Sequence, residues 1–300
     1  MEVRNGMIEG MVSCIIPTYK RSDTLIRAIE SVLKQTYTNI EVIVVDDNEP
    51  NDSFSIESKN KVKAIKDNRI RFIQQDQHIN GAVARNVGIK NAKGEYIAFL
   101  DDDDEWIDDK LEKQIDYLKN SENYDGVSCL YVVKANNEIV RRCVPYTGEN
   151  LHWNVLSRSI SVFTTTIVLK KKALDEAGYF DEELLRHQDL QLLLDFLYDH
   201  NMGVLNEYKA VLHADSDINH PDLKRMINIK QMFFDKCEKH FMRYNAKEQK
   251  EIYDAHYFEI VIAAIREKNP IIAIKYLFKI GVNIGSYRAV IKRWKDRQNE

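Results

Sequence analysis

The sequence lacks the features that would set it apart from ordinary globular proteins. It contains no run of about 18 apolar residues, and its first residues, MEVRNGMIEGM, include no apolar segment of a signal peptide. We therefore expect neither a membrane span nor secretion, and place the protein in the cytoplasm. Its four cysteines form no C-x-x-C pair, so a zinc knuckle and a thioredoxin-type motif are not indicated.

An excess of positive charge is also missing. The formal net charge is -4, whereas a nucleic-acid-binding domain normally carries a basic surface, so we expect no nucleic acid partner. Charge is nevertheless concentrated at two places. Seven of the nine residues from Asp101 to Asp109 are acidic, and the last stretch of the chain is basic through Arg288, Lys292, Arg293, Lys295 and Arg297.

Apolar runs and helical patterns alternate in the first third of the chain. Because this alternation is typical of βαβ units, it predicts an α/β protein with a mostly parallel sheet. Ligands of such sheets bind beyond the carboxyl ends of the strands. The predicted strands are 12–17, 40–45, 70–74 and 95–100, and the predicted helices are Ser22–Gln35, 55–66 and 81–92, with Ser22 or Asp23 as the N-cap of the first.

The pattern changes after residue 125. Three strand-like pieces, GVSCLYVV, EIVRRC and VFTTTIVL, follow without helices between them and predict added mixed strands at one edge of the sheet. Helices are expected near 171–177 and 188–200, and helical patterns continue from about 221 to the end. We therefore expect two domains, residues 1–218 and a helical region 219–300.

Four adjacent carboxylates, Asp101 to Asp104, follow the predicted strand EYIAFL. Like charges this close repel one another, and a divalent cation would neutralise them. Oxygen-only ligands favour Mg²⁺ or Mn²⁺, which commonly bridge carboxylates to substrate phosphates. The alternatives are an acidic surface loop, or an N-cap for a helix starting near Trp106.

A second carboxylate pair, Asp46 and Asp47, ends the predicted strand IEVIVV. A carboxylate at this edge can accept hydrogen bonds from a nucleotide base or a ribose, although an Asx-turn or a helix cap would use the same residue type. No G-x-G-x-x-G or G-x-x-x-x-G-K-[ST] motif accompanies these strands, so phosphate binding would need another device.

Five motifs in order resemble the family 2 glycosyltransferases of the GT-A fold: IIPTYKR at 15–21, VVDD at 44–47, GAVARNVGI at 81–89, GEYIAFLDDDD at 94–104 and HQDL at 187–190. The resemblance covers about residues 11–215 and is strongest with bacterial enzymes that build surface polysaccharides. It implies an inverting transferase that moves a sugar from a nucleotide diphosphate, such as a UDP-sugar, to a hydroxyl of a glycan or lipid-linked glycan.

The resemblance assigns the donor side of the site residue by residue. It places Pro17 and Tyr19 beside the nucleotide base, has Asp47 accept hydrogen bonds from that base, and makes Asp46 a supporting residue. Arg85 would approach the diphosphate or the base, for which the alternative is a surface helix arginine.

The resemblance also identifies the metal and the catalytic base. Asp101-Asp102-Asp103 matches the D-x-D motif, in which Asp103 binds Mn²⁺ or Mg²⁺, Asp101 contacts the ribose or supports the ion, and Asp102 is the variable position. His213 would be a further metal ligand, or else a structural histidine. Asp189 would be the general base, although Gln188 replaces the acid that usually precedes it, and a helix cap is the alternative.

Two other classes of protein share part of these features. A nucleotidyltransferase also needs carboxylates, a metal and an α/β sheet, but its glycine- and lysine-rich phosphate loop is missing. A non-catalytic nucleotide-sugar or carbohydrate binding module would not need Asp47, Asp103 and Asp189 together.

The end of the chain carries an amphipathic basic segment, residues 270–298. Its apolar residues, Ile271, Ile274, Leu277, Phe278 and Val282, alternate with lysines and arginines. Such a segment can lie on an anionic membrane, which predicts peripheral contact at the inner face of the cell membrane. The alternative is that the apolar stripe packs on the catalytic core and the basic face is solvated.

Overall fold

The computed structural model describes residues 3–4, 6–214 and 221–281, and the chain divides into two compact units. The first unit comprises Met1–Tyr146, Val162–Glu182 and Asp195–Ser216, and the second comprises Thr147–Ser161, Glu183–Leu194 and Asp217–Glu300. Segments 147–161 and 183–194, which the sequence-based boundary left in the first domain, thus belong with the C-terminal helices. No helix in the described ranges is long and apolar enough to cross a bilayer.

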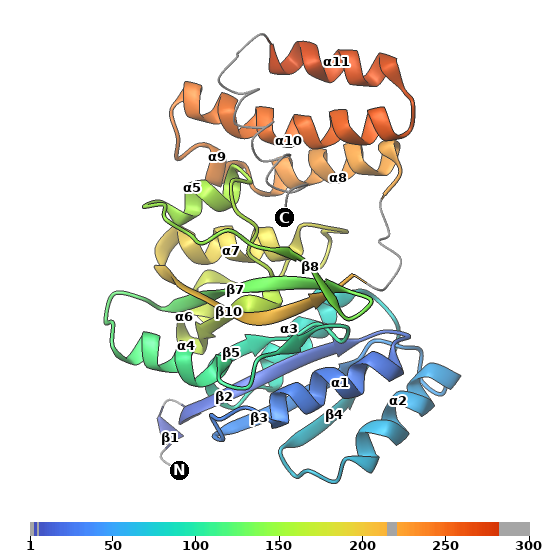
Figure 1. Ribbon diagram of the computed structural model, residues 1–300, viewed down its shortest axis with the longest axis vertical. Coiled ribbons are helices and arrows are strands. Elements are labelled where there is room, and N and C mark those ends of the chain that lie inside the picture. The colour runs from blue at the N-terminus through green and yellow to red at the C-terminus, as the bar shows by residue number, and fades with distance from the viewer. Residues whose placement is uncertain (1–2, 5, 215–220, 282–300) are drawn as a thin grey trace. The chain divides into compact units, whose positions relative to one another are not determined.

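The first unit is built on a ten-stranded sheet with the order β4-β3-β2-β5-β9-β7-β10-β6, to which β1 and β8 add at β2 and β7 (Figure 1). β4, β3, β2 and β5 are parallel, as are β7 and β10, whereas β9 and β6 run antiparallel to their neighbours. The strands are β1 (Val3–Arg4), β2 (Met7–Thr18), β3 (Ile40–Asp46), β4 (Ile70–Gln74), β5 (Gly94–Phe99), β6 (Glu105–Trp106), β7 (Gly126–Ala135), β8 (Glu138–Arg142), β9 (Ile167–Lys170) and β10 (Met202–His213).

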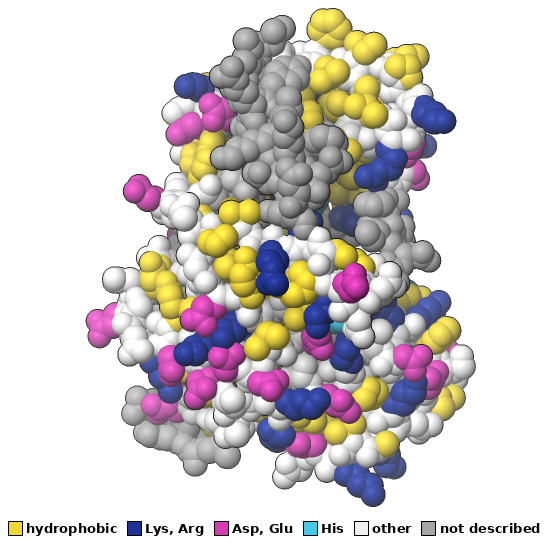
Figure 2. All heavy atoms as spheres, viewed as in Figure 1, with side chains coloured by type: hydrophobic (Ala, Val, Ile, Leu, Met, Phe, Trp, Pro, Cys, Tyr) yellow, Lys and Arg dark blue, Asp and Glu magenta, His cyan; other side chains and the backbone are white. Residues whose placement is uncertain are grey.

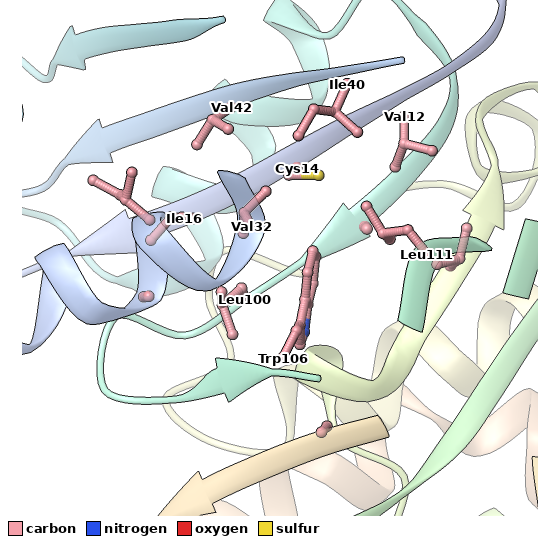
Figure 3. Close-up of a cluster of buried hydrophobic side chains, with 14 of the residues drawn as sticks. Val12, Cys14, Ile16, Val32, Ile40, Val42, Leu100, Trp106 and Leu111 are labelled. Atoms are coloured by element: carbon pink, nitrogen blue, oxygen red, sulfur yellow. The ribbon is translucent and has the colours of Figure 1, made fainter. Parts of the chain in front are cut away.

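Helices cover both faces of this sheet. Successive side chains of a strand point to opposite faces, and on β2 the side chains on each face are buried under helices. On β2, Val12, Cys14 and Ile16 point into the large core that α1 and α4 close, together with Trp106 (Figure 3). Ile15 points to the opposite face, where a Cβ on Gly88 of α3 would lie 2.4 Å from its side chain. The helices of this unit are α1 (Ser22–Leu33), α2 (Ser53–Ala64), α3 (Gly81–Asn91), α4 (Lys110–Lys119) and α6 (Lys171–Ala177).

The second unit is helical. It contains α5 (Leu151–Leu156), α8 (Leu223–Lys236), α9 (Glu238–Phe241), α10 (Ala246–Arg266) and α11 (Pro270–Ile280), together with the start of α7 (Gln188–Asp199). A buried ion pair ties these helices together, because Lys230 Nζ on α8 lies 2.5 Å from Glu259 on α10. Burial alone would raise the pKa of Glu259, but Lys230 and Arg158 hold it well below its usual range.

The structure confirms the alternation of strands and helices and corrects three local expectations. A helix, α5, interrupts the region that was expected to hold strands alone. Within that region the threonines of VFTTTIVL, Thr164–Thr166, form a 3₁₀ turn, and the strand β9 begins only at Ile167. The acidic run caps no helix near Trp106, since that residue lies in β6 and α4 begins at Lys110. The N-cap of α1 is Arg21, whose side chain makes no capping bond, rather than Ser22 or Asp23.

Candidate active site

A cavity of about 410 Å³ opens in the first unit at the carboxyl ends of β2, β3 and β5, where the parallel order predicted a ligand. Its wall is formed by residues from the ends of these strands, from the loop before α3 and from α3 itself. These residues are Pro17, Thr18, Tyr19, Arg21, Asp47, His78, Gly81, Arg85, Asp101, Asp102 and Asp103. Seven of the sequence-predicted donor and metal residues, all except Asp46 and His213, therefore line one cavity.

The four consecutive aspartates after β5 alternate between two environments. Asp102 and Asp104 are each only 6% exposed, and each is held by a threonine hydroxyl. Thr18 Oγ1 donates to Asp102 over 2.8 Å, and Thr165 Oγ1 donates to Asp104 over 2.8 Å. Asp101 and Asp103 are less buried and face the cavity. The threonine bonds thus hold Asp102 and Asp104 in buried positions and leave Asp101 and Asp103 as the more exposed carboxylates of the run.

Burial and the repulsion of neighbouring charges raise the pKa of three carboxylates of the run, those of Asp102, Asp103 and Asp104. Burial raises the pKa of Asp102 to about 7, although the Thr18 hydroxyl favours its ionised form. Burial and then the charge of Asp101 raise the pKa of Asp103. Burial, Asp101 and Asp103 together raise the pKa of Asp104 well above its usual value. A cation placed among these groups would favour their charged forms.

Two arginines already supply positive charge there. Arg85 on α3 forms an ion pair with Asp101, and Arg21 at the start of α1 forms ion pairs with Asp102 and Asp103. The Arg21 side chain is 44% exposed, so its release from these partners would uncover less buried surface than the release of Arg85, whose side chain is 14% exposed. A guanidinium also matches the oxygens of a phosphate in a bidentate manner, which suits both residues to a diphosphate ligand.

The donor set fits a metal ion that is shared with phosphate. Among the described residues no three His, Cys, Asp or Glu side chains gather as a metal cage. Mg²⁺ and similar ions are usually held by one or two carboxylates together with substrate phosphates. Asp101 and Asp103, on one wall of the cavity, are such a pair, and the ion would take over the charge compensation that Arg21 now provides.

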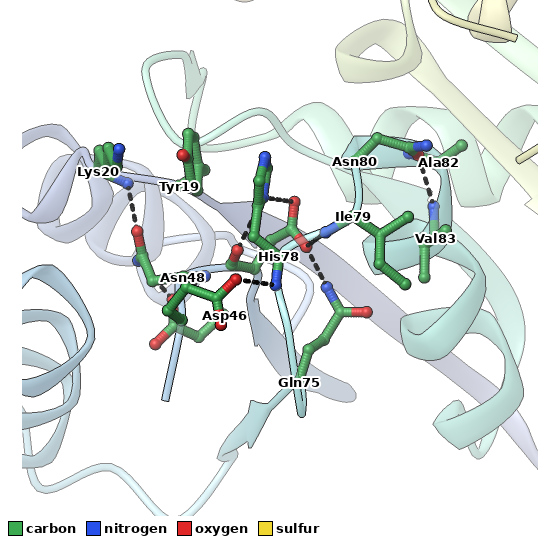
Figure 4. Close-up of polar contacts among 12 residues, drawn as sticks. Tyr19, Lys20, Asp46, Asn48, Gln75, His78, Ile79, Asn80, Ala82 and Val83 are labelled. Atoms are coloured by element: carbon green, nitrogen blue, oxygen red, sulfur yellow. Dashed lines mark hydrogen bonds and ion pairs between the residues drawn. The ribbon is translucent and has the colours of Figure 1, made fainter. Parts of the chain in front are cut away.

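Another part of the cavity wall is formed by Asp47 and by the rings of Tyr19 and His78, the two aromatic residues labelled in Figure 4. The Tyr19 and His78 rings are stacked, with centroids 4.0 Å apart and planes inclined by 13°. Asp47 Oδ1 accepts hydrogen bonds from Gln75 Nε2 at 2.5 Å and from the Ile79 amide at 3.1 Å. Burial raises the pKa of Asp47, while the bonds from Ile79, His78 and Gln75 oppose that shift.

The other three predicted site residues are not among the residues that line the cavity. Asp46 is fully buried and accepts hydrogen bonds from the Asn48 amide and side chain, which shapes the turn that carries Asp47. His213 donates its backbone N–H to Asp104, and its Nε2 lies 3.3 Å from Glu105. Asp189 is partly buried in the first turn of α7, among residues of the second unit.

Sequence reasoning missed four residues of the cavity: Thr18, Arg21, His78 and Gly81. Thr18 and Arg21 stand inside the IIPTYKR motif and Gly81 begins GAVARNVGI, so their motifs were a signal for them. His78 belongs to no motif. Only the stacking seen in the structure reveals it.

Comparisons with known proteins agree with this geometry. The family model described as glycosyl transferase family 2 matches residues 13–178. The Escherichia coli UDP-Glc:alpha-D-GlcNAc-diphosphoundecaprenol beta-1,3-glucosyltransferase WfgD is 33% identical over 230 residues, which are 74% of this chain and 86% of the relative. The amylovoran biosynthesis glycosyltransferase AmsB of Erwinia amylovora is 30% identical over 61% of this chain and 62% of its own.

Solved structures share the fold. Staphylococcus aureus TarS 1-349 in complex with UDP-GlcNAc has a TM-score of 0.57 at 18% identity, covering 97% of this chain and 92% of that one. The mannosyltransferase PcManGT of Pyrobaculum calidifontis, solved with GDP-Man and Mn²⁺, has a TM-score of 0.58 at 16% identity, over 94% and 78%. These similarities confirm the GT-A type α/β fold expected from the motifs.

Proposed function

Because the chain belongs to glycosyl transferase family 2, we propose that it is a metal-dependent, inverting transferase that moves a sugar from UDP to a hydroxyl of a lipid-linked glycan in polysaccharide assembly. The observation that carries the proposal is one cavity lined by Asp47 after β3, Asp103 after β5 and Arg85 on α3. Binding of a sugar nucleotide requires a hydrogen-bond acceptor for the nucleotide base, a ligand for the metal ion and a cation for the phosphates. Asp47, Asp103 and Arg85 are suited to these three roles.

The base lies against Tyr19 and Asp47. Asp47 Oδ1 is bonded to Gln75 and Ile79, and Oδ2, which His78 Nδ1 contacts at 2.9 Å, is the oxygen that would accept from a ligand in place of the imidazole. An ionised carboxylate accepts only, so it favours a base with a ring N–H, as uracil has. WfgD, whose name specifies UDP-Glc, supports uracil as the base of the donor.

The diphosphate lies between Arg85, Arg21 and the acidic run. Asp103 would bind the divalent ion, Mn²⁺ or Mg²⁺, and Asp101 would contact the ribose or support the ion; both side chains are more exposed than Asp102 and Asp104, which supports this register of the D-x-D motif. When bound, the ion would supply Lewis-acid stabilisation of the charge that develops on the leaving diphosphate. The Mn²⁺ in the PcManGT structure supports the use of a divalent ion.

Asp102 has a different role in this proposal. It accepts hydrogen bonds from the Thr18 hydroxyl and the Tyr19 amide, and so holds in place the residues against which the nucleotide base lies.

Asp189 is the general base in this proposal. Its carboxylate removes the proton from the acceptor hydroxyl while that oxygen attacks the anomeric carbon from the face opposite the diphosphate. One displacement inverts the anomeric configuration. His213, through its backbone bond to Asp104, supports the acidic run and remains a candidate metal ligand.

A lipid-linked acceptor requires the enzyme to work at a membrane surface. On α11 the side chains of Ile271, Ile274 and Phe278 are 78%, 53% and 81% exposed. Hydrophobic side chains gather over this part of the surface, at the top of Figure 2. Lys275 and Lys279 lie on the same exposed helix, so the surface combines apolar and basic groups that suit anionic lipid. The other basic residues of this segment, with Val282, lie outside the described residues. We propose peripheral contact at the inner face of the cell membrane through α11.

Transfer assays test the function. The protein is incubated with UDP-sugars, Mn²⁺ and a GlcNAc-diphospholipid acceptor, and the product linkage is determined by NMR. We expect metal-dependent transfer with inversion at the anomeric carbon. Turnover that is unaffected by chelation of divalent ions would contradict the metal role, and a retained anomeric configuration would contradict the single displacement.

A further inference from the structure

The imidazole of His78 makes the two contacts that the proposed function assigns to the nucleotide base. Its ring is stacked on Tyr19 with centroids 4.0 Å apart, and its Nδ1 lies 2.9 Å from Asp47 Oδ2 (Figure 4). The same nitrogen lies 3.0 Å from the carbonyl oxygen of Asp47. Since a carbonyl oxygen can only accept, the proton is on Nδ1, and His78 presents a ring N–H to the carboxylate.

The contacts leave no room for a second ring in the same place. Asp47 is 3% exposed, and Gln75 and Ile79 occupy its other oxygen, so Oδ2 is the point at which a ligand can bond. A planar base that stacks on this face of Tyr19 and donates a ring N–H to Oδ2 must therefore displace the imidazole. His78 stands in the loop between β4 and α3, its backbone N–H bonded to Glu49, and its side chain is 35% exposed. Rotation of the side chain alone can vacate the position.

We propose that His78 determines the affinity for the donor by occupying the base position in the unliganded protein. This inference rests on the proposed function, because it requires a nucleotide base in the cavity. When no donor is bound, His78 donates to Asp47 Oδ2, so this buried oxygen is not left without a hydrogen-bond partner. The donor then binds only the fraction of molecules in which the imidazole has left, which weakens its apparent affinity by that fraction.

The test is calorimetric titration of UDP, with Mn²⁺ present, into the wild type and three variants. We expect His78→Ala to bind UDP about tenfold more tightly, a factor in the range of one hydrogen bond to a charged group. His78→Phe keeps the stacking ring without the N–H and is expected to lie between the wild type and His78→Ala. Gln77→Ala changes an exposed neighbour in the same loop that takes no part in the contacts with Asp47 and Tyr19 described above, and should bind as the wild type does.

A second readout follows the imidazole itself. In the wild type, the NMR signals of the His78 ring should shift on addition of UDP to the value seen for an exposed histidine. Unchanged His78 signals, or equal or weaker UDP binding by His78→Ala, would overturn the inference. If UDP binds neither the wild type nor His78→Ala, the proposed function fails instead, so the two failures are distinguishable.

Discussion

Thr18 Oγ1 donates a 2.8 Å hydrogen bond to Asp102 Oδ2, joining the end of β2 to the acidic run 84 residues later in the chain. Asp102 is buried, and the bond favours its ionised form against the pKa rise to about 7 that burial causes. This one bond therefore connects the part of the cavity next to Tyr19, where the nucleotide base is proposed to bind, to the acidic run, where the metal ion is proposed to bind.

Loss of this hydroxyl should weaken both fold and site. We expect Thr18→Val to reduce the free energy of unfolding by about 1–3 kcal/mol, the usual contribution of a buried hydrogen bond to a charged group. UDP binding should weaken in parallel. Urea unfolding and calorimetry measure the two effects. Thr24→Val is the control, since the Thr24 hydroxyl makes only an exposed bond to a backbone oxygen; similar losses in both variants would contradict the account.

The metal role of Asp103 predicts a loss specific to the ion. In Asp103→Asn the amide keeps the size of the side chain and removes its charge, so Mn²⁺-dependent thermal stabilisation by UDP should vanish and transfer should fall about 100-fold or more. Asp108→Asn removes the same charge from an exposed position a few residues away and should retain both. Full Mn²⁺-dependent stabilisation of Asp103→Asn would exclude its role as ligand.

The role of Asp189 as general base predicts that binding and chemistry separate. Asp189→Asn should bind the UDP-sugar with a Kd like that of the wild type, while kcat for transfer falls by roughly 10²–10⁴-fold. Asp199→Asn, an exposed position at the other end of α7, is the matched control and should keep its kcat. If Asp189→Asn transfers at the wild-type rate, the base is another residue.

Replacement of the buried Lys110 should change the stability of the protein without changing the residues that line the cavity. Its Nζ is fully buried without a hydrogen-bond partner, 4.0 Å from the Trp106 ring centroid, and burial lowers its pKa from 10.5 to about 8. Because the folded pKa lies below the unfolded one, protonation favours unfolding. This penalty is complete below about pH 8 and disappears as the pH rises from 8 towards 10.5.

We therefore expect Lys110→Met to raise the free energy of unfolding at pH 7 by about 1–3 kcal/mol, with a smaller gain at pH 9.5. Urea unfolding at both pH values measures the difference. Lys113→Met, at an exposed position of the same helix, should change little. A Lys110→Met variant less stable than the wild type would mean that the cation–π contact outweighs the cost of burial.

If α11 contacts lipid, removing its exposed apolar side chains should reduce the amount of protein that sediments with vesicles. Replacing Ile271 and Phe278 together by Gln should lower the fraction that sediments with vesicles containing anionic lipid, because both side chains are exposed. Met242→Gln alters another exposed apolar side chain of the second unit and serves as the control. Equal sedimentation of the double variant and the wild type would show that α11 does not bind the membrane.

The sequence predicted the sheet well because its strands are continuous apolar runs that end at polar residues. β4 was placed at Ile70–Gln74 with the observed bounds, and the carboxyl ends of β2, β3 and β5 carry the expected site residues. The short elements were missed, since α5 and β6 have too few residues for a periodic pattern to be read.

The site itself was only partly readable. Motifs identified Asp47, Arg85 and the acidic run, but only the resemblance to the D-x-D motif, and not the four adjacent aspartates themselves, indicated which carboxylates face a ligand. That choice depends on hydroxyls distant in sequence, Thr18 and Thr165, which reach the run only through the order of the sheet. His78 was unreadable for the same reason, because its partners Tyr19 and Asp47 come from two other strand ends.

The central claim is that one cavity binds the base, the diphosphate and the metal ion of the donor. Its most direct test is a crystal structure of the protein with UDP and Mn²⁺. We predict the uracil ring stacked on Tyr19 with its ring N–H on Asp47, and Mn²⁺ between Asp103 and the phosphates. An empty cavity, or a nucleotide bound away from Asp47 and Asp103, would contradict the account.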